Sequence, residues 1–169
     1  MKAPDPDQEA VYTAEDRLQR WLDHAGPVTV YGSTWDLEPE ARFGQVADIQ
    51  TYVDKVLAHV GCARPVMVRE RRGPSRAEYG PGVIAIPQRR VGGQWAMREY
   101  IVLHELAHHL DAAAQVPALL RFGGAHGPSF RAQYLNLLSS LGRPTWAYLL
   151  GCAFADAGLS DRRPQTAFI

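Results

Sequence analysis

The residues of greatest chemical interest are His104, Glu105 and His108, which form the pattern His-Glu-x-x-His. On a helix, two histidines four positions apart lie one turn from each other on the same face, so both rings can reach one metal ion. The glutamate between them points to the flank of that face, where it can hold a water molecule instead of the metal. This spacing predicts a zinc site in which Glu105 is the general base of a hydrolase, most readily a metallopeptidase.

A catalytic zinc ion takes three protein ligands and keeps one position open for water. We expect His126 to be the third ligand, because it stands directly before a predicted helix that can hold it in place. Asp111 is the competing candidate. One turn beyond His108, however, its carboxylate is better suited to accept a hydrogen bond from the second ring nitrogen of a ligand histidine. His109 falls on the flank of the helix and cannot join the other two on one metal, so we place it at the edge of the core.

Amide hydrolysis also needs a donor for the negative oxygen of the tetrahedral intermediate. The candidates are Tyr134, Tyr148 and Arg131, although each of them also suits a purely structural role. An extended peptide or protein substrate could add as a strand to the edge of the sheet predicted near residues 79–86.

Hydrophobic periodicity and breaker residues predict the elements that position these side chains. Helices are expected at residues 8–24, 39–60, 97–114, 128–141 and 144–157, and strands at residues 28–31, 65–70, 76–79 and 82–87, with residues 34–37 extending or pairing the first strand. At about 100° per residue, the paired histidines and Asp111 share one narrow face of the helix at 97–114. Leucines 103, 106 and 110 lie on nearly the opposite face. We therefore expect the back of this helix in the core and its histidine face toward a cleft.

These elements predict one α+β domain over residues 9–158, after a disordered segment at 1–8 and before a flexible tail at 159–169. A small mixed sheet should pack against the helix at 39–60 and the active-site helix, with the C-terminal helices closing the other side.

Composition argues against several other classes of protein. Eighteen basic residues match eighteen acidic ones, which gives no indication of a nucleic-acid partner. Arginines 69, 71, 72 and 76 are interpreted as part of a solvated strand and turn. The two cysteines, 62 and 152, are too few for a disulfide scaffold. Residues 1–7 lack the apolar core of a signal peptide, and no apolar run could span a membrane, so we expect a cytoplasmic protein with no membrane partner. The oligomeric state is left open.

Two segments carry a resemblance to known proteins. The pattern His104-Glu105-Leu106-Ala107-His108, followed by Ala125-His126-Gly127-Pro128-Ser129-Phe130, resembles the minimal zincin metallopeptidases of the SprT-like type. In those proteins a third histidine followed by Gly-x-x-Phe stands at the start of a helix. Over residues 9–158, the chain more closely resembles a family of small metallohydrolases of actinobacteria and their phages, through residues 11–15, 46–57, 102–110 and 125–130.

This resemblance implies a zincin-like α+β fold, one Zn²⁺ ion on His104, His108 and His126, and Glu105 as the catalytic base. It implies no substrate, because the closer family is named for its motif. The chain departs from the metzincins, which have glycine where Asp111 stands and histidine where Ala114 stands. No cysteine-rich zinc ribbon follows, so the DNA-repair role of SprT-like proteins is not carried over.

Two other interpretations remain open. The scaffold could be a non-enzymatic binding or regulatory module, but the intact Glu105 favours an enzyme, since a pure binding site needs no general base. A structural zinc site would need a fourth protein ligand, and Asp111 is the nearby candidate.

Overall fold

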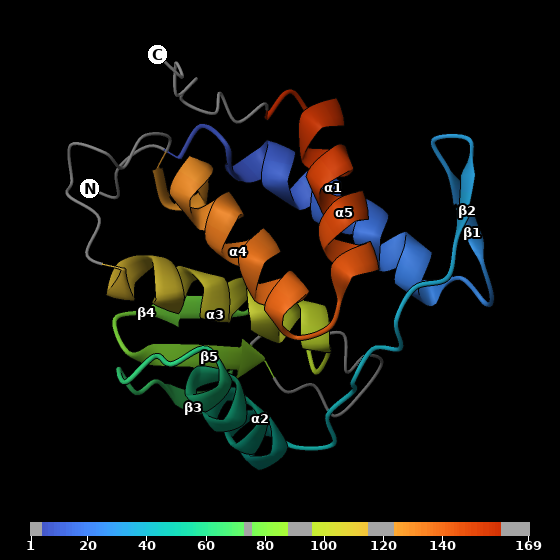
Figure 1. The fold of residues 1–169 in the computed structure, drawn as a ribbon. Helices are drawn as coiled ribbons and strands as arrows, with labels where there is room; N and C mark the ends of the chain where they lie inside the picture. Colours follow the sequence, from blue (N-terminus) through green and yellow to red (C-terminus); the bar gives the residue numbers. More distant parts are fainter. Residues whose placement is uncertain (1–4, 73–75, 88–95, 115–123, 160–169) are drawn as a thin grey trace.

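A computed structural model describes residues 5–72, 76–87, 96–114 and 124–159 of the chain (Figure 1). Its elements are α1 (Gln8–Asp23), β1 (Val28–Val30), β2 (Ser33–Trp35), α2 (Val46–His59), β3 (Met67–Arg71), β4 (Glu78–Gly80), β5 (Val83–Pro87), α3 (Glu99–Ala113), the short 3₁₀ helix η2 (Gly124–His126), α4 (Pro128–Ser140) and α5 (Pro144–Asp156). The predicted α+β class is confirmed. The loop expected at residues 91–94, and parts of the turn at 71–75 and of the connection at 118–127, lie outside the described residues.

The fold is layered around α3. In the three-stranded sheet the order is β3-β5-β4, with β3 parallel and β4 antiparallel to β5. Helix α2 packs on β3, and α3 packs beside β4. Beyond α3 lies α4, which packs on α5, and α5 packs on α1 (Figure 1). The mixed sheet, which contacts α2 and α3 and has the C-terminal helices beyond α3, agrees with the predicted arrangement.

Helix α3 is buried on nearly every side, although His104 and Glu105 line a cavity, in agreement with the expected cleft. Leu103 and Leu106 are fully buried, as predicted for the apolar back, whereas Leu110 on the same face is only partly buried. On the front, His104 and Glu105 are each only 6% exposed. The helical wheel could not show this, because the cover comes from α1 and α4, which are distant in sequence.

Helix α2 begins at Val46, later than the predicted start at residue 39. A capping box formed by Gln45 and Asp48 starts the helix. The preceding segment runs extended along the start of α3, where Phe43 donates a backbone hydrogen bond to Met97 at 2.9 Å. These backbone bonds to a distant segment outweigh the local signal of Pro39.

The expectation of disorder at residues 1–8 is corrected for residues 5–8, which have defined positions. The carboxylates of Asp5 and Asp7 are anchored by hydrogen bonds to residues of η2 and α4, and Gln8 begins α1. Residues 1–4 and most of the expected tail, 160–169, lie outside the described residues. Leu159 packs against the core.

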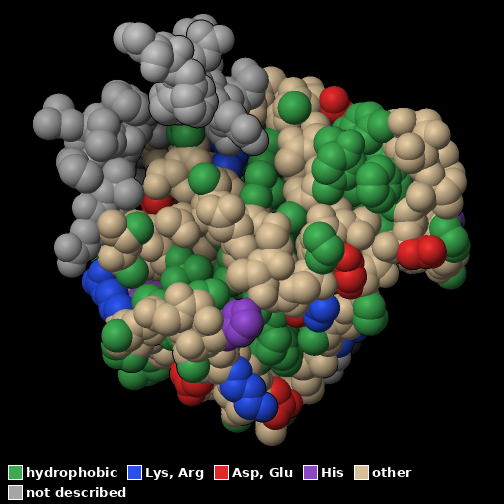
Figure 2. All heavy atoms as spheres, viewed as in Figure 1, with side chains coloured by type: hydrophobic (Ala, Val, Ile, Leu, Met, Phe, Trp, Pro, Cys, Tyr) green, Lys and Arg blue, Asp and Glu red, His purple; other side chains and the backbone are tan. Residues whose placement is uncertain are grey.

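The surface agrees with the balanced charge. On the face that Figure 2 shows, basic and acidic side chains are interspersed and not gathered by sign. Cys62 and Cys152 are free thiols. Among the described residues, no helix combines the length and the apolar character that crossing a bilayer requires.

Candidate metal centre

The structure brings His104, His108 and His126 together. The Nε2 atom of His104 lies 3.2 Å from Nε2 of His108 and 3.3 Å from Nε2 of His126. Their potential ligand atoms all lie within 4.8 Å of one another. Within the described ranges, these three form the one group of at least three His, Cys, Asp or Glu side chains placed to hold a metal ion.

Two elements position the three rings. His104 and His108 occupy successive turns of α3, and His126 ends η2, just before Pro128 begins α4. Phe130, in the first turn of α4, packs against all three rings and stacks on His108 with a centroid separation of 4.2 Å. The Gly-x-x-Phe motif after His126 therefore has a packing reason, because the aromatic ring walls off one side of the triad from water.

Two of the three rings are each held by a carboxylate at Nδ1, the nitrogen that faces away from the other rings. Glu15 of α1 lies 2.6 Å from Nδ1 of His104, and Asp5 lies 2.6 Å from Nδ1 of His126. Both carboxylate side chains are less than a tenth exposed. A carboxylate on Nδ1 fixes the orientation of the ring and leaves Nε2 free to bind a metal.

The same carboxylates also affect the pKa values of the two rings that they contact. Burial alone would lower the pKa of His104, but the negative charge and hydrogen bond of Glu15 outweigh it, so this pKa is raised above its ordinary value. The pKa of His126 is lowered, chiefly by burial and with a further contribution from His104, although Asp5 opposes the shift.

The donor set fits a cation. If Nδ1 of His104 and of His126 each donates its proton to a carboxylate, the Nε2 lone pairs of the neutral rings face each other at 3.3 Å. Such an arrangement needs positive charge at its centre, either a proton on His104 or a metal ion. Three imidazole nitrogens match the ligand preference of zinc. The residues present therefore fit a zinc ion.

Glu105 lies beside His104 at a cavity of about 320 Å³. Burial raises the pKa of its carboxyl to about 7, although a hydrogen bond from the backbone of Tyr79 and the charge on His104 oppose the shift. The other cavity-lining residues are Tyr12, Glu15, Asp16, Gln19, Arg76, Ala77, Tyr100 and Ile101. A substrate in this cavity would meet Glu105 next to the histidine triad.

Two further polar residues near the end of α3 contact neighbouring elements. Asp111, near the end of α3, accepts a hydrogen bond from the hydroxyl of Ser129 in α4. His109 is fully buried, with Nε2 2.9 Å from the carbonyl of Arg64 and Nδ1 3.3 Å from the hydroxyl of Tyr79. It is therefore buried more deeply than the expected position at the edge of the core. The ring of Tyr79 also stacks on His108, so β4 is joined to the histidine helix.

The three expected oxyanion candidates are placed differently from one another. Tyr134 lies near His104, but its fully buried hydroxyl donates to the carbonyl of Tyr100 at 2.9 Å and also contacts Glu15. Tyr148 is half exposed, and its ring packs at a tilt against that of Trp35 in the β1–β2 hairpin. In Figure 1 this hairpin lies across the molecule from the start of α4. The structure therefore does not bring Tyr148 to the triad.

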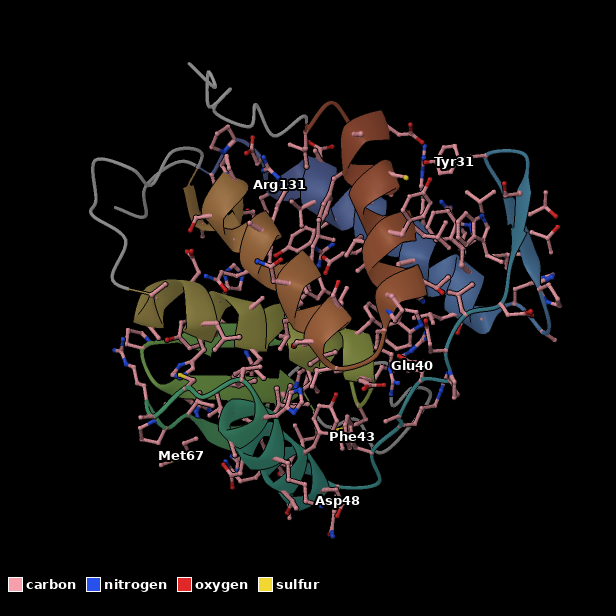
Figure 3. All side chains as sticks on the ribbon, in the orientation of Figure 1. Tyr31, Glu40, Phe43, Asp48, Met67 and Arg131 are labelled. Atoms are coloured by element: carbon pink, nitrogen blue, oxygen red, sulfur yellow. The ribbon has the colours of Figure 1, made fainter. Side chains whose placement is uncertain are left out.

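Arg131, the third candidate, is buried next to the start of α1 (Figure 3). Its Nη1 atom donates to the backbone carbonyl of His126 at 2.9 Å and to Asp7 at 2.7 Å. This arginine holds the turn that carries the third histidine.

Four residues of the site were not foreseen as such. Glu15 and Asp5 contact two histidines of the triad. Tyr12 packs edge-on against His126 and has the Arg76 guanidinium 4.0 Å from its ring centroid. The sequence holds one usable signal for Glu15. It is an acidic residue within the apolar face of α1, flanked along that face by the buried Val11 and Leu18.

Comparisons with known proteins give no relative: no family model matches the chain, and neither a curated protein nor a solved structure does.

Proposed function

We propose that this protein is a zinc-dependent hydrolase, and most specifically a metallopeptidase that cleaves amide bonds. The observation that carries the proposal is the convergence of three histidine Nε2 atoms, two of them on rings held by buried carboxylates, beside a cavity that contains Glu105. Three protein ligands are the complement of a catalytic zinc site, which keeps a further position open.

A zinc ion bound here would supply Lewis acidity, lowering the pKa of water and polarising a substrate carbonyl. The chain's own residues do the rest. Glu105 takes a proton from the attacking water and passes it to the leaving nitrogen. Glu15 and Asp5 hold His104 and His126 in position. Phe130 excludes water from one side of the triad.

The arrangement of the elements supports a zincin-like fold. A mixed sheet precedes the His-Glu-x-x-His helix, and the strand nearest that helix, β4, is the antiparallel edge strand of the described sheet. The backbone of Tyr79 in β4 bonds to Glu105. An extended peptide added to this edge would lie close to the catalytic base.

Arg76 is a better candidate than Tyr134 or Tyr148 for stabilising a negative oxygen. Among the described residues that line the cavity, Arg76 is the one arginine or lysine, and Glu105 lines the same cavity. Its guanidinium packs over Tyr12, which in turn packs on the ring of His126. Arg76→Gln should lower kcat more than it raises KM, because the interaction forms in the transition state.

Metal analysis of purified protein tests the centre of the proposal. We expect about one equivalent of zinc per chain and its loss in His126→Ala, because two remaining imidazoles bind zinc weakly. His24→Ala is the matched control, since His24 is an exposed histidine after α1. Zinc that stays near one equivalent in His126→Ala would exclude His126 as a ligand.

A second candidate function is a zincin-fold module that binds a partner without hydrolysis. The deep burial of Glu105 favours it, because a buried carboxylate is less accessible to a substrate. Glu105→Gln separates the two. For an enzyme, the rate of hydrolysis of unfolded protein substrates should fall by about 10²–10⁴-fold with zinc retained. Zinc binding without hydrolysis by the wild-type protein would favour the binding module.

A further inference from the structure

The segment at residues 5–7 lies against the turn that carries the third histidine. Asp5 is the main contact: its Oδ2 atom lies 2.6 Å from Nδ1 of His126, and its Oδ1 atom accepts from the backbone N–H of the same residue at 3.4 Å. Ring and backbone of His126 are thus both held by one side chain that is 8% exposed.

A second contact joins the same two segments. Arg131 is 2% exposed, and its Nη1 atom donates both to Asp7 and to the carbonyl of His126. Removing Asp7 from this position would leave a buried guanidinium with less compensation, so the pairing favours a docked segment.

Gly124, two residues before His126, gives independent support. It has a φ of +76°, and a Cβ atom at this position would lie 2.8 Å from the Cα atom of Asp5. Only glycine allows the backbone of the turn and the backbone of the segment to approach so closely.

From these contacts we infer that Asp5 is a positioning residue for the third metal ligand, and that docking of residues 5–7 and metal binding are coupled. This inference rests on the proposed metal site. A carboxylate on Nδ1 raises the basicity of the ligand and fixes its ring, and losing such a partner costs about 10–100-fold in metal affinity. Because coupling is reciprocal, a bound metal must in turn favour the docked segment.

Zinc affinity of the full chain, measured by competition with a chelator, tests the coupling. Asp5→Ala should bind zinc about 10–100-fold more weakly than wild type. Its Co²⁺ complex should show altered visible bands, because His126 is no longer held in one orientation. Glu9→Gln is the charge-matched control, since Glu9 is exposed in the first turn of α1. It should leave both measurements unchanged.

Two glycine variants test the same point if Asp5→Ala does not fold. Gly124→Ala and Gly142→Ala impose the same kind of backbone strain, at φ +76° and +71°, but only the first places a methyl group against Asp5. Gly124→Ala should weaken zinc binding, and Gly142→Ala should not. In wild type, zinc should also slow amide hydrogen exchange at residues 7–9.

The outcomes separate this inference from the proposed function. Wild-type protein that takes up no zinc would overturn both. Wild-type protein that binds zinc, with Asp5→Ala equal to it in affinity and in Co²⁺ spectrum, would overturn the coupling alone. Equal zinc affinity for the two glycine variants would do the same.

Discussion

Two buried polar clusters lie along α3, and they differ in how their charges are balanced. At the start of the helix, Arg98 bonds to Glu40 at 2.8 Å and to Asp23 at 2.9 Å. Next to it, Glu99 accepts from the hydroxyl of Tyr52 at 2.6 Å and from Arg143 at 3.2 Å. Each charge in this first cluster faces a charge of opposite sign or a hydrogen-bond donor.

The second cluster lies further along the same helix, and its polar groups are arranged differently. Its carboxylates, Glu15 and Asp5, bind the outer nitrogens of their histidines, while the inner nitrogens face one another. The comparison teaches that burial of polar side chains does not by itself mark a functional site. A candidate site is marked instead by side-chain nitrogens that converge on one point, as the three Nε2 atoms do here.

The largest change in stability is expected when an ion pair of the first cluster is broken. Arg98→Met leaves Glu40, whose side chain is 6% exposed, without its main partner. The free energy of unfolding should fall by about 3–5 kcal/mol, measured by urea denaturation. The double variant Arg98→Met/Glu40→Met should recover most of this loss, because apolar side chains can replace a closed ion pair. No recovery would show that the first cluster does more than balance charge.

Zinc should change the free energy of unfolding by a smaller amount, and only by binding to the histidines of the second cluster. At a free zinc concentration of 100 times Kd, the wild-type protein should gain about 2.7 kcal/mol of stability, because the metal binds only the folded state. His108→Ala should gain much less, while Arg98→Met should gain as much as wild type. A zinc response that also disappears in Arg98→Met would mean that the two clusters are not independent.

The smallest effect concerns the exposed edge of the first cluster. Burial would raise the pKa of Asp23, but its hydrogen bond to Arg98 and the arginine's charge outweigh this and lower the pKa below its ordinary 3.8. The stabilisation is therefore present above about pH 4 and is lost as pH falls through the lowered pKa. Asp23→Asn should cost less than about 1 kcal/mol at pH 7, because the side chain is partly exposed. A difference from wild type that does not shrink as the pH is lowered through the acid range would contradict this assignment.

The sequence was sufficient for the part of the site that depends on local geometry. The spacing of His104 and His108 determines their common face on any helix, and Pro128 marks the start of the helix that follows His126. Helices α1, α4 and α5 and the strands of the sheet follow from hydrophobic periodicity in the same way. The convergence of the three rings was a prediction about tertiary structure, and the structure places them together.

The sequence was not sufficient for contacts made across the chain. Glu15 and Asp5 stand 89 and 121 residues from the histidines that they contact, and no periodic pattern reports such a pairing. The extended segment before α2 was missed for a similar reason, since its partners are the backbone groups of Met97 and Glu99. The burial of His104 also depends on helices that a wheel drawn for α3 alone does not contain.

The packing of α1 on α5 has a consequence for biosynthesis. Glu15 reaches His104 from a helix that packs on the last helix of the described chain, and Arg17 of α1 pairs with Asp156 of α5 at 2.7 Å. During vectorial synthesis, α1 leaves the ribosome first but gains its packing partner only after about 130 further residues have been added. The histidine helix is therefore complete well before its carboxylate partner can be held in place. If the triad holds a metal ion as proposed, metal loading should then be a late step that follows the synthesis of α5.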